Sequence, residues 1–245
     1  MKVTIFTSNN IRHNYLIKEI SKVAKEVYAI REFRPKYEGE KKTIYKKSKT
    51  IKEYFKKVYR AQKFVFKETN NLILPIPKKN IIDIENGKLS KIKIKDHLNF
   101  FTSDLYIVFG SSFIKGEVCK FLIANKAINI HMGISPFYRG ADCNFWSLYD
   151  KNLKYVGSTI HYLSKGLDSG KILYYNYPKY NKNPFIFSMS ATKTAILSLK
   201  KKIKDNSMSK IKPFKQIKKN LIRYSTKREF TSSVIHEFYK KYNIK

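Results

Sequence analysis

The 245-residue sequence lacks the features that mark several common classes of protein. It has two cysteines, Cys119 and Cys143, which cannot form a disulfide framework. No apolar run approaches the roughly 18 to 20 residues that a membrane-spanning helix needs. The N-terminal residues also show no apolar signal-peptide core. We therefore expect a reduced, cytoplasmic protein without a membrane span.

The motifs of several enzyme classes are missing as well. The five histidines and two cysteines are dispersed and do not have zinc-ligand spacing, so we expect no metal site. The chain has no GxxxxGK(S/T) phosphate loop, no GxGxxG after its first apolar segment and no serine in a GxSxG turn. These absences argue against the commonest nucleotide-binding, metal-dependent and serine-hydrolase classes.

Arginine is scarce although the chain is strongly basic. The net charge is +33, yet 44 of the 51 basic residues are lysine. Arginine makes the bidentate contacts with phosphate and guanine, so its scarcity weakens a nucleic-acid interpretation. Lys, Ile, Asn, Tyr and Phe are also the residues that an AT-rich genome tends to encode. The charge has two interpretations: compositional bias on solvated surfaces, or attraction for an anionic partner such as a nucleotide-linked substrate, a tRNA or a membrane surface.

The order of apolar segments predicts an α/β fold. Residues 2–6 and 27–30 are expected strands, and residues 11–26 between them carry apolar residues at helical spacing. A strand, a helix and a second strand in this order begin a parallel, doubly wound sheet. We therefore expect an open, mostly parallel, Rossmann-like sheet with helices on both faces.

The rest of the chain continues this pattern. Further strands are expected at residues 104–109, 127–132, 157–163 and 171–177, and helices at 50–67, 142–149 and 183–202. Residues 133–140 are expected to form a loop, because they contain proline and glycine. We predict a main domain over residues 1–203, followed by a short basic C-terminal extension over residues 204–245.

Two polar residues interrupt the expected strand at 127–132. Asn129 and His131 alternate with Ile128 and Ile130, so the two polar side chains point to the same face of the strand. Polar groups inside a core strand cost free energy unless they are hydrogen bonded. A lone histidine on a strand is more often structural, so the interpretation depends on the segments that follow.

Three further motifs follow this Asn-x-His pair. They are P-x-x-R-G at residues 136–140, G-x-T-x-H at 157–161 and G-x-D-x-G at 166–170. Over residues 129–173 the chain closely resembles the folate-dependent formyltransferases, whose core pattern is an Asn-x-His strand, a Leu-Pro-x-x-x-Gly loop, a Gly-Val-Thr strand and a Gly-x-Asp-x-Gly turn. Members of that family act on methionyl-tRNA, glycinamide ribonucleotide or nucleotide-linked amino sugars.

The resemblance implies a catalytic trio of Asn129, His131 and Asp168, with 10-formyltetrahydrofolate as the formyl donor. Formyl transfer to an amine passes through a tetrahedral intermediate that carries negative charge on the former formyl oxygen. The Asn129 amide and a His131 N–H can donate to that oxygen, and one such donor is worth on the order of 3 kcal/mol. Asp168, on a turn flanked by glycines, can hold His131 in its donating form and accept the amine proton directly or through water. A carboxylate near His131 would also raise the histidine pKa.

The resemblance also implies residues for each substrate. Residues 109–114 resemble the segment whose backbone binds the pterin ring, so the predicted donor-binding residues are Phe109, Gly110, Ser111, Ile114 and Asp168. The predicted acceptor-binding residues are Arg139, Trp146 and Thr159. A loop-anchoring salt bridge is an equal alternative for Arg139. Trp146 and His161 are expected to pack in the core or line the acceptor pocket rather than to catalyse.

The acceptor amine is the open question. Residues 7–14 (TSNNIRHN) lack the Gly/Ser-rich phosphate turn of glycinamide-ribonucleotide enzymes. The residues after 173 are too few for the C-terminal barrel domain that methionyl-tRNA enzymes usually add. Residues 131–147 look most like sugar N-formyltransferases, so we favour a nucleotide-linked amino sugar or a similar small, anionic amine.

Two alternatives to this function remain. Methionyl-tRNA is the second candidate acceptor. A different class is a non-catalytic family member that binds nucleic acid through its basic surface. Residues 204–245 are also expected to contribute to a homodimer contact.

Overall fold

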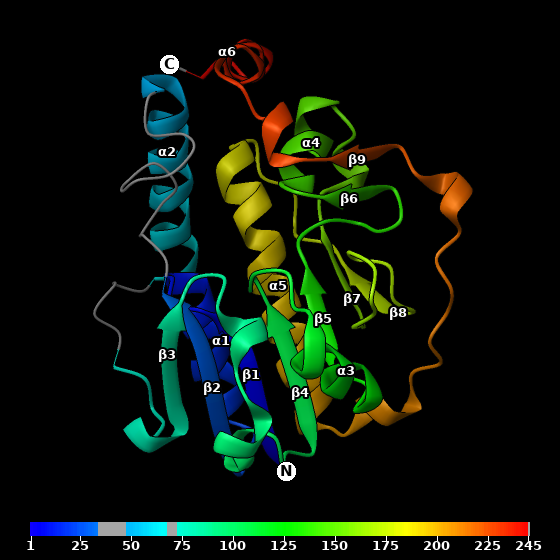
Figure 1. Cartoon of the computed structure of the whole chain (residues 1–245). Coiled ribbons are helices and arrows are strands. Elements are labelled where there is room, and N and C mark those ends of the chain that lie inside the picture. Colours follow the sequence, from blue (N-terminus) through cyan, green and yellow to red (C-terminus); the bar gives the residue numbers. More distant parts are fainter. Residues whose placement is uncertain (34–47, 68–72, 245) are drawn as a thin grey trace.

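A seven-stranded sheet forms the centre of the molecule (Figure 1). The computed structural model describes residues 1–33, 48–67 and 73–244. The strands lie in the order β3-β2-β1-β4-β5-β7-β8. Their bounds are β1 (Lys2–Ser8), β2 (Glu26–Phe33), β3 (Ile81–Glu85), β4 (Leu105–Phe109), β5 (Ile128–His131), β7 (Ser158–Tyr162) and β8 (Ile172–Asn176). All pairs from β3 to β5 are parallel, whereas β5–β7 and β7–β8 are antiparallel. The expected mostly parallel sheet is confirmed.

Helices cover both faces of the sheet, as expected. The helices are α1 (Ile11–Ser21), α2 (Lys49–Phe66), α3 (Gly116–Ala124), α4 (Cys143–Tyr149), α5 (Pro184–Lys204) and α6 (Ser232–Lys241). In β1, Val3 and Ile5 pack with α1 and α5, whereas Phe6 packs on the opposite face with α3. This alternation is the period-two pattern of a strand that is buried on both sides. Within the described ranges, no helix is long and apolar enough to cross a membrane.

The first helix is shorter than expected. It ends at Ser21 rather than at residue 26. The backbone N–H groups of Val23 and Ala24 both donate to the carbonyl of Ile20, which closes the last turn of α1. The N–H of Lys25 then donates to the carbonyl of Met1 and leads the chain into β2. The end of α1 is therefore set by the start of β2, which helical spacing in the sequence does not reveal.

A second core lies beyond the carboxyl ends of the strands, and the C-terminal residues help to build it. Tyr54 of α2 packs against Phe145 of α4, against Phe238 of α6 and against Phe230, which precedes α6. The ring centroids are 5.1 to 6.1 Å apart. Burial of such aromatic side chains contributes strongly to stability. The division into residues 1–203 and 204–245 stays a prediction, although α6 packs directly against α2 and α4.

Two short strands lie outside the main sheet. They are β6 (Tyr138–Gly140) and β9 (Arg223–Ser225), which pair in parallel. Residues 138–140 were expected to be part of a loop, so the strand assignment is a correction. The sequence has no strand pattern here, because β6 is only three residues long and pairs with β9, which lies far along the chain.

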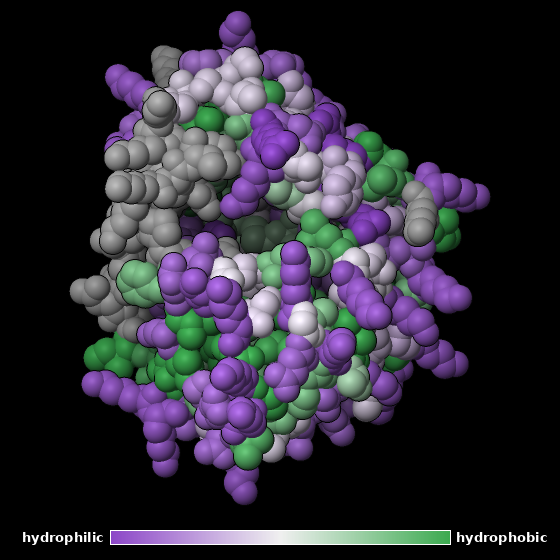
Figure 2. Space-filling model, in the orientation of Figure 1, coloured by the Kyte–Doolittle hydropathy of each residue, from purple (hydrophilic) through white to green (hydrophobic). Residues whose placement is uncertain are grey.

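The strand order places a crevice at the centre of the sheet. β2 and β3 lie on one side of β1, and β4 and β5 lie on the other. Open α/β sheets bind ligands beyond the carboxyl ends of the strands at such a point of reversal. Figure 2 shows a hollow in this face of the molecule, with hydrophilic side chains over much of the surrounding surface.

Candidate active site

His131 and Asp168 form a buried ion pair at the end of β5. His131 Nδ1 lies 3.3 Å from Asp168 Oδ2, and their side chains are 7% and 10% exposed. Burial lowers the pKa of His131, but the Asp168 carboxylate and the neighbouring Cys143 together outweigh burial and hold this pKa well above 6.5. Burial likewise raises the pKa of Asp168, yet the nearby His131 gives a net lowering. Each charge thus stabilises the other, and both shifts favour an imidazolium facing a carboxylate.

The third residue of the trio is held by His161 on β7. The antiparallel pairing of β5 with β7 places Asn129 directly opposite His161. His161 Nδ1 lies 2.8 Å from the Tyr162 carbonyl oxygen, so Nδ1 carries the ring proton. Nε2 then accepts from Asn129 Nδ2 at 3.0 Å. This arrangement fixes the Asn129 amide and leaves its second N–H to donate elsewhere.

His161 is neutral, in contrast to His131. Burial lowers the pKa of His161 to about 4, although Asp168 Oδ1 lies 3.9 Å from its Nε2. A positioning role for His161 was not among the roles inferred from the sequence. The signal that points to it is the alternation of Thr159 and His161 on a strand antiparallel to Asn129 and His131. Antiparallel strands with polar residues at matching positions bring those side chains together on one face.

Two cavities meet at His131. The smaller, of about 280 Å³, lies beyond β4 and β5 and is lined by Asn129, His131, His161 and Asp168. The larger, of about 390 Å³, lies among α2, α4 and α5. Both cavities are lined by Arg12, Gly110, His131, Met132 and Gly140. The trio therefore faces a space that two molecules could enter from different sides.

All the predicted donor-binding residues line the smaller cavity. They are Phe109, Gly110, Ser111, Ile114 and Asp168. Gly110 has a φ of +62°, and a Cβ there would lie 2.3 Å from His13 Nε2. The buried Glu32 accepts from the Ser112 backbone N–H at 2.6 Å and also from the Ser112 hydroxyl. The backbone that follows β4 is therefore held in one conformation beside the trio.

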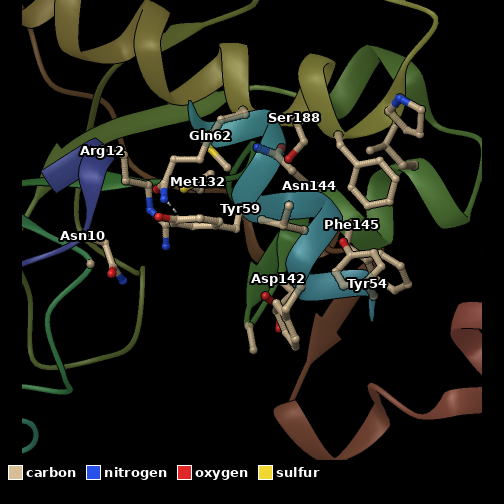
Figure 3. A pocket seen from close by; sticks show the side chains of 18 of the residues that line it. Asn10, Arg12, Tyr54, Tyr59, Gln62, Met132, Asp142, Asn144, Phe145 and Ser188 are labelled. Carbon is tan, nitrogen blue, oxygen red and sulfur yellow. Dashed lines mark hydrogen bonds between the residues drawn. The ribbon is translucent and has the colours of Figure 1, made fainter. Parts of the chain in front are cut away.

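The larger cavity combines aromatic and polar side chains (Figure 3). Arg12 and Gln62 lie at one end, joined by a hydrogen bond of 3.2 Å, and Tyr54 and Phe145 lie at the other. Asn144 lies between them and is 3% exposed. Its Oδ1 accepts from the Gly157 N–H at 3.0 Å, whereas its Nδ2 has no hydrogen-bond partner in the part of the chain described.

The predicted acceptor-binding residues line neither cavity. Arg139 Nη2 donates to the carbonyl of Leu167, in the turn that carries Asp168. The Trp146 ring lies 4.4 Å from the Arg223 guanidinium carbon. Thr159 donates to the Gly133 carbonyl at 2.6 Å and accepts from the Ser135 N–H at 2.9 Å. These contacts hold the loops of the site, and roles in acceptor binding remain predictions.

Gly140 lets the C-terminal strand β9 approach the site. Its φ is +96°, and a Cβ there would lie 2.1 Å from the Ser225 carbonyl oxygen. The Gly140 N–H also donates to the Asp168 carboxylate, which helps to lower the pKa of Asp168. The pairing of β6 with β9 is therefore coupled to the position of a site residue.

The fold and site together define an α/β protein in which two cavities meet at a buried histidine–carboxylate pair. In the described ranges no group of three or more His, Cys, Asp or Glu side chains could hold a metal ion. The family model described as formyl transferase matches residues 18–183, which is more than half of the chain. The chain belongs to this folate-dependent formyltransferase family, and the protein is a formyltransferase.

Solved structures share the whole fold. A 4-N formyltransferase from Francisella tularensis is 17% identical, with a TM-score of 0.61, covering 98% of this chain and 87% of that one. A sugar N-formyltransferase from a Shewanella species is 16% identical, with a TM-score of 0.59 and coverage of 99% and 87%. An N-formyltransferase from Helicobacter canadensis, solved with folinic acid and dTDP-3-aminofucose, is 15% identical, with a TM-score of 0.54 and coverage of 99% and 80%. No curated protein sequence matches the chain.

Proposed function

We propose that this formyltransferase moves the formyl group of 10-formyltetrahydrofolate to the primary amine of a nucleotide-linked amino sugar. The observation that carries the proposal is the position of the His131–Asp168 pair where two cavities meet. A reaction between two bound molecules needs such a meeting point, because it converts a bimolecular encounter into an oriented one. The fold shared with sugar N-formyltransferases supports the same class of acceptor.

The smaller cavity fits the pterin part of the donor. A pterin is a flat ring with hydrogen-bond donors and acceptors on its edge. The fixed backbone after β4 offers N–H and C=O groups to such an edge, and Val108, Ile114 and Leu163 supply apolar surface for the ring. When bound, 10-formyltetrahydrofolate supplies the formyl group and a nitrogen that can leave with a proton.

The larger cavity fits a polar acceptor. Aromatic side chains of α2 and α4 line it, together with Arg12 and Lys227. The partnerless Asn144 Nδ2 is the sharpest feature, because a buried donor without a partner is costly unless a ligand oxygen accepts from it. A sugar hydroxyl or carbonyl oxygen next to the amine would accept from Asn144. The cationic lining favours phosphates on the same molecule.

The trio divides the chemistry of transfer. As the amine attacks the formyl carbon, Asn129 and His131 donate to the oxygen on which negative charge develops. Asp168 accepts the proton of the attacking amine, directly or through water. Its lowered pKa makes it a weak base, so it accepts the proton only once attack has made the amine strongly acidic. The new C–N bond forms, the bond to the folate nitrogen breaks, and the proton ends on that nitrogen.

The acceptor is tested by supplying 10-formyltetrahydrofolate with a panel of amines. The panel contains amino-sugar nucleotides, charged initiator tRNA and glycinamide ribonucleotide, and the readouts are tetrahydrofolate release and the mass of the product. Of these amines, we expect only an amino-sugar nucleotide to react, and it should give tetrahydrofolate and the formamido-sugar nucleotide in equimolar amounts. Turnover with charged tRNA instead would contradict the proposed sugar acceptor and support methionyl-tRNA as the acceptor. Absence of turnover with every amine, together with polynucleotide binding that falls steeply with salt, would favour the binding class.

A further inference from the structure

The C-terminal segment reaches the turn that carries Asp168. β8 is the last strand of the sheet, so its outer edge has backbone groups that the sheet does not pair. Phe214 and Ile172 exchange two backbone hydrogen bonds there, of 2.8 and 2.9 Å, in an antiparallel bridge. Because antiparallel residues advance in opposite directions, Gln216 comes to lie opposite Gly170.

Gln216 joins the two ends of this turn. Its Nε2 lies 2.8 Å from the Asp168 carbonyl oxygen and 2.8 Å from the Gly170 carbonyl oxygen. A side-chain amide nitrogen carries two N–H groups, one for each carbonyl. The reverse orientation would place Oε1 against two carbonyl oxygens, so the contacts themselves fix the amide. Oε1 is buried and has no partner among the described residues, so the amide is held through the two bonds that Nε2 donates.

The turn needs such support at Asp168. This residue has a φ of +47°, a left-handed conformation that costs aspartate more free energy than glycine. Strained backbone persists only where the surrounding structure holds it in place. Arg139 fixes the residue before Asp168 through the Leu167 carbonyl, and Gln216 fixes Asp168 itself and Gly170 beyond it.

We infer that Gln216 is a positioning residue, which holds the Asp168 carboxylate against His131 by bridging the Asp168 and Gly170 carbonyls. The inference rests on the proposed catalytic role of Asp168. It also gives the C-terminal segment a part in the reaction that differs from a contact between subunits. Gln216 touches neither cavity, so its effect passes through the backbone of the turn.

The test compares Gln216→Met with Lys215→Met. Methionine keeps the length of the side chain and removes both N–H donors, whereas Lys215 is an exposed neighbour on the same segment. We expect Gln216→Met to lower kcat about tenfold or more, because small displacements of reacting groups have effects of this size. The KM for the acceptor should change less than twofold. Lys215→Met should match the wild type in both constants.

A second readout needs no substrate. The pKa of His131, followed by NMR, should fall in Gln216→Met because the carboxylate that raises it is less firmly held. The other titratable or charged groups around the pair, His161, Cys143 and Arg139, are unchanged in this variant. A lower melting temperature with kcat and the His131 pKa unchanged would show a purely structural role and overturn the inference.

Two outcomes separate this inference from the proposed function. If the wild type formylates no amine but the His131 pKa falls in Gln216→Met, the proposed function fails and the positioning role stands. If Gln216→Met does not fold, the wild type gives the answer through hydrogen exchange. Both Nε2 protons of Gln216 should then exchange slowly with solvent, and fast exchange would overturn the inference.

Discussion

Two buried histidines in this site have pKa values shifted in opposite directions. His131 faces the Asp168 carboxylate through Nδ1 and has a raised pKa. His161 gives its Nδ1 proton to a backbone carbonyl and presents a lone pair to Asn129, and burial lowers its pKa to about 4. The environment of one ring thus favours positive charge, and the other ring orients an amide. Groups whose environments push their pKa values apart in this way are typical of catalytic sites.

Replacing the carboxylate tests this difference. In Asp168→Asn the pKa of His131 should fall, because burial remains and the opposing charge is gone. The variant should lose on the order of 2 kcal/mol of unfolding free energy, less than for a fixed charge because His131 can release its proton. The loss should be largest between about pH 4 and pH 6.5, the ordinary pKa values of the two groups.

The sign on each side of that window follows from the two shifts. The raised pKa of His131 means that its contribution disappears as pH rises through the folded value. The lowered pKa of Asp168 means that its contribution disappears as pH falls through the folded value. Chemical denaturation of the wild type and of Asp168→Asn, from acid to alkaline pH, measures the difference in their unfolding free energies. A difference that does not vary with pH would contradict the ion pair.

Asn144 allows an isosteric test of the acceptor cavity. Asn144→Asp keeps an oxygen to accept from the Gly157 N–H but replaces the partnerless Nδ2 donor with an acceptor. Loss of a hydrogen bond to a ligand oxygen costs about 1 to 3 kcal/mol, so the KM for the acceptor should rise about tenfold or more. The KM for the folate donor should stay the same. Steady-state kinetics in each substrate provide the measurement, and an equal rise in both KM values would refute this role.

At the scale of elements, β6 and β9 show what local patterns cannot predict. Six of the seven strands of the main sheet were predictable, because each carries apolar residues that the sheet buries, whereas β3 has no fully buried residue and was not predicted. β6 and β9 are three residues each and acquire strand geometry from each other. The trio could be named from residue order and resemblance, but its support by His161 and Gln216 depends on tertiary pairing that no local motif records.

The pair β6–β9 depends on Gly140. Gly140→Ala would force a Cβ to 2.1 Å from the Ser225 oxygen at a φ of +96°. Gly87→Ala is the matched control, because Gly87 has a φ of +85° and open space around its Cβ position. The control should lose about 1 kcal/mol of unfolding free energy and Gly140→Ala about 3 kcal/mol or more, measured by urea denaturation. Equal losses would show that β9 does not need to approach so closely.

For the whole molecule, the net charge of +33 admits a direct test. If the basic surface attracts an anionic acceptor, kcat/KM should fall roughly tenfold as salt rises from about 20 mM to about 500 mM, because surface charges become screened. The kcat should not change, since the bound complex has already formed. An uncharged amino sugar should show no such dependence. If kcat/KM for the nucleotide-linked acceptor does not change with salt concentration, the result would support compositional bias as the origin of the charge.

Tetrahydrofolate release by trio variants is the direct test of formyl transfer through Asn129, His131 and Asp168. Wild type, Asn129→Ala, His131→Ala and Asp168→Ala are compared at saturating 10-formyltetrahydrofolate and amino-sugar nucleotide, with circular dichroism to verify the fold. We expect each substitution to slow release on the order of 100-fold or more while the fold persists, because each removes a group that acts on the developing charge or the proton. A folded variant that retains the full rate would contradict this mechanism.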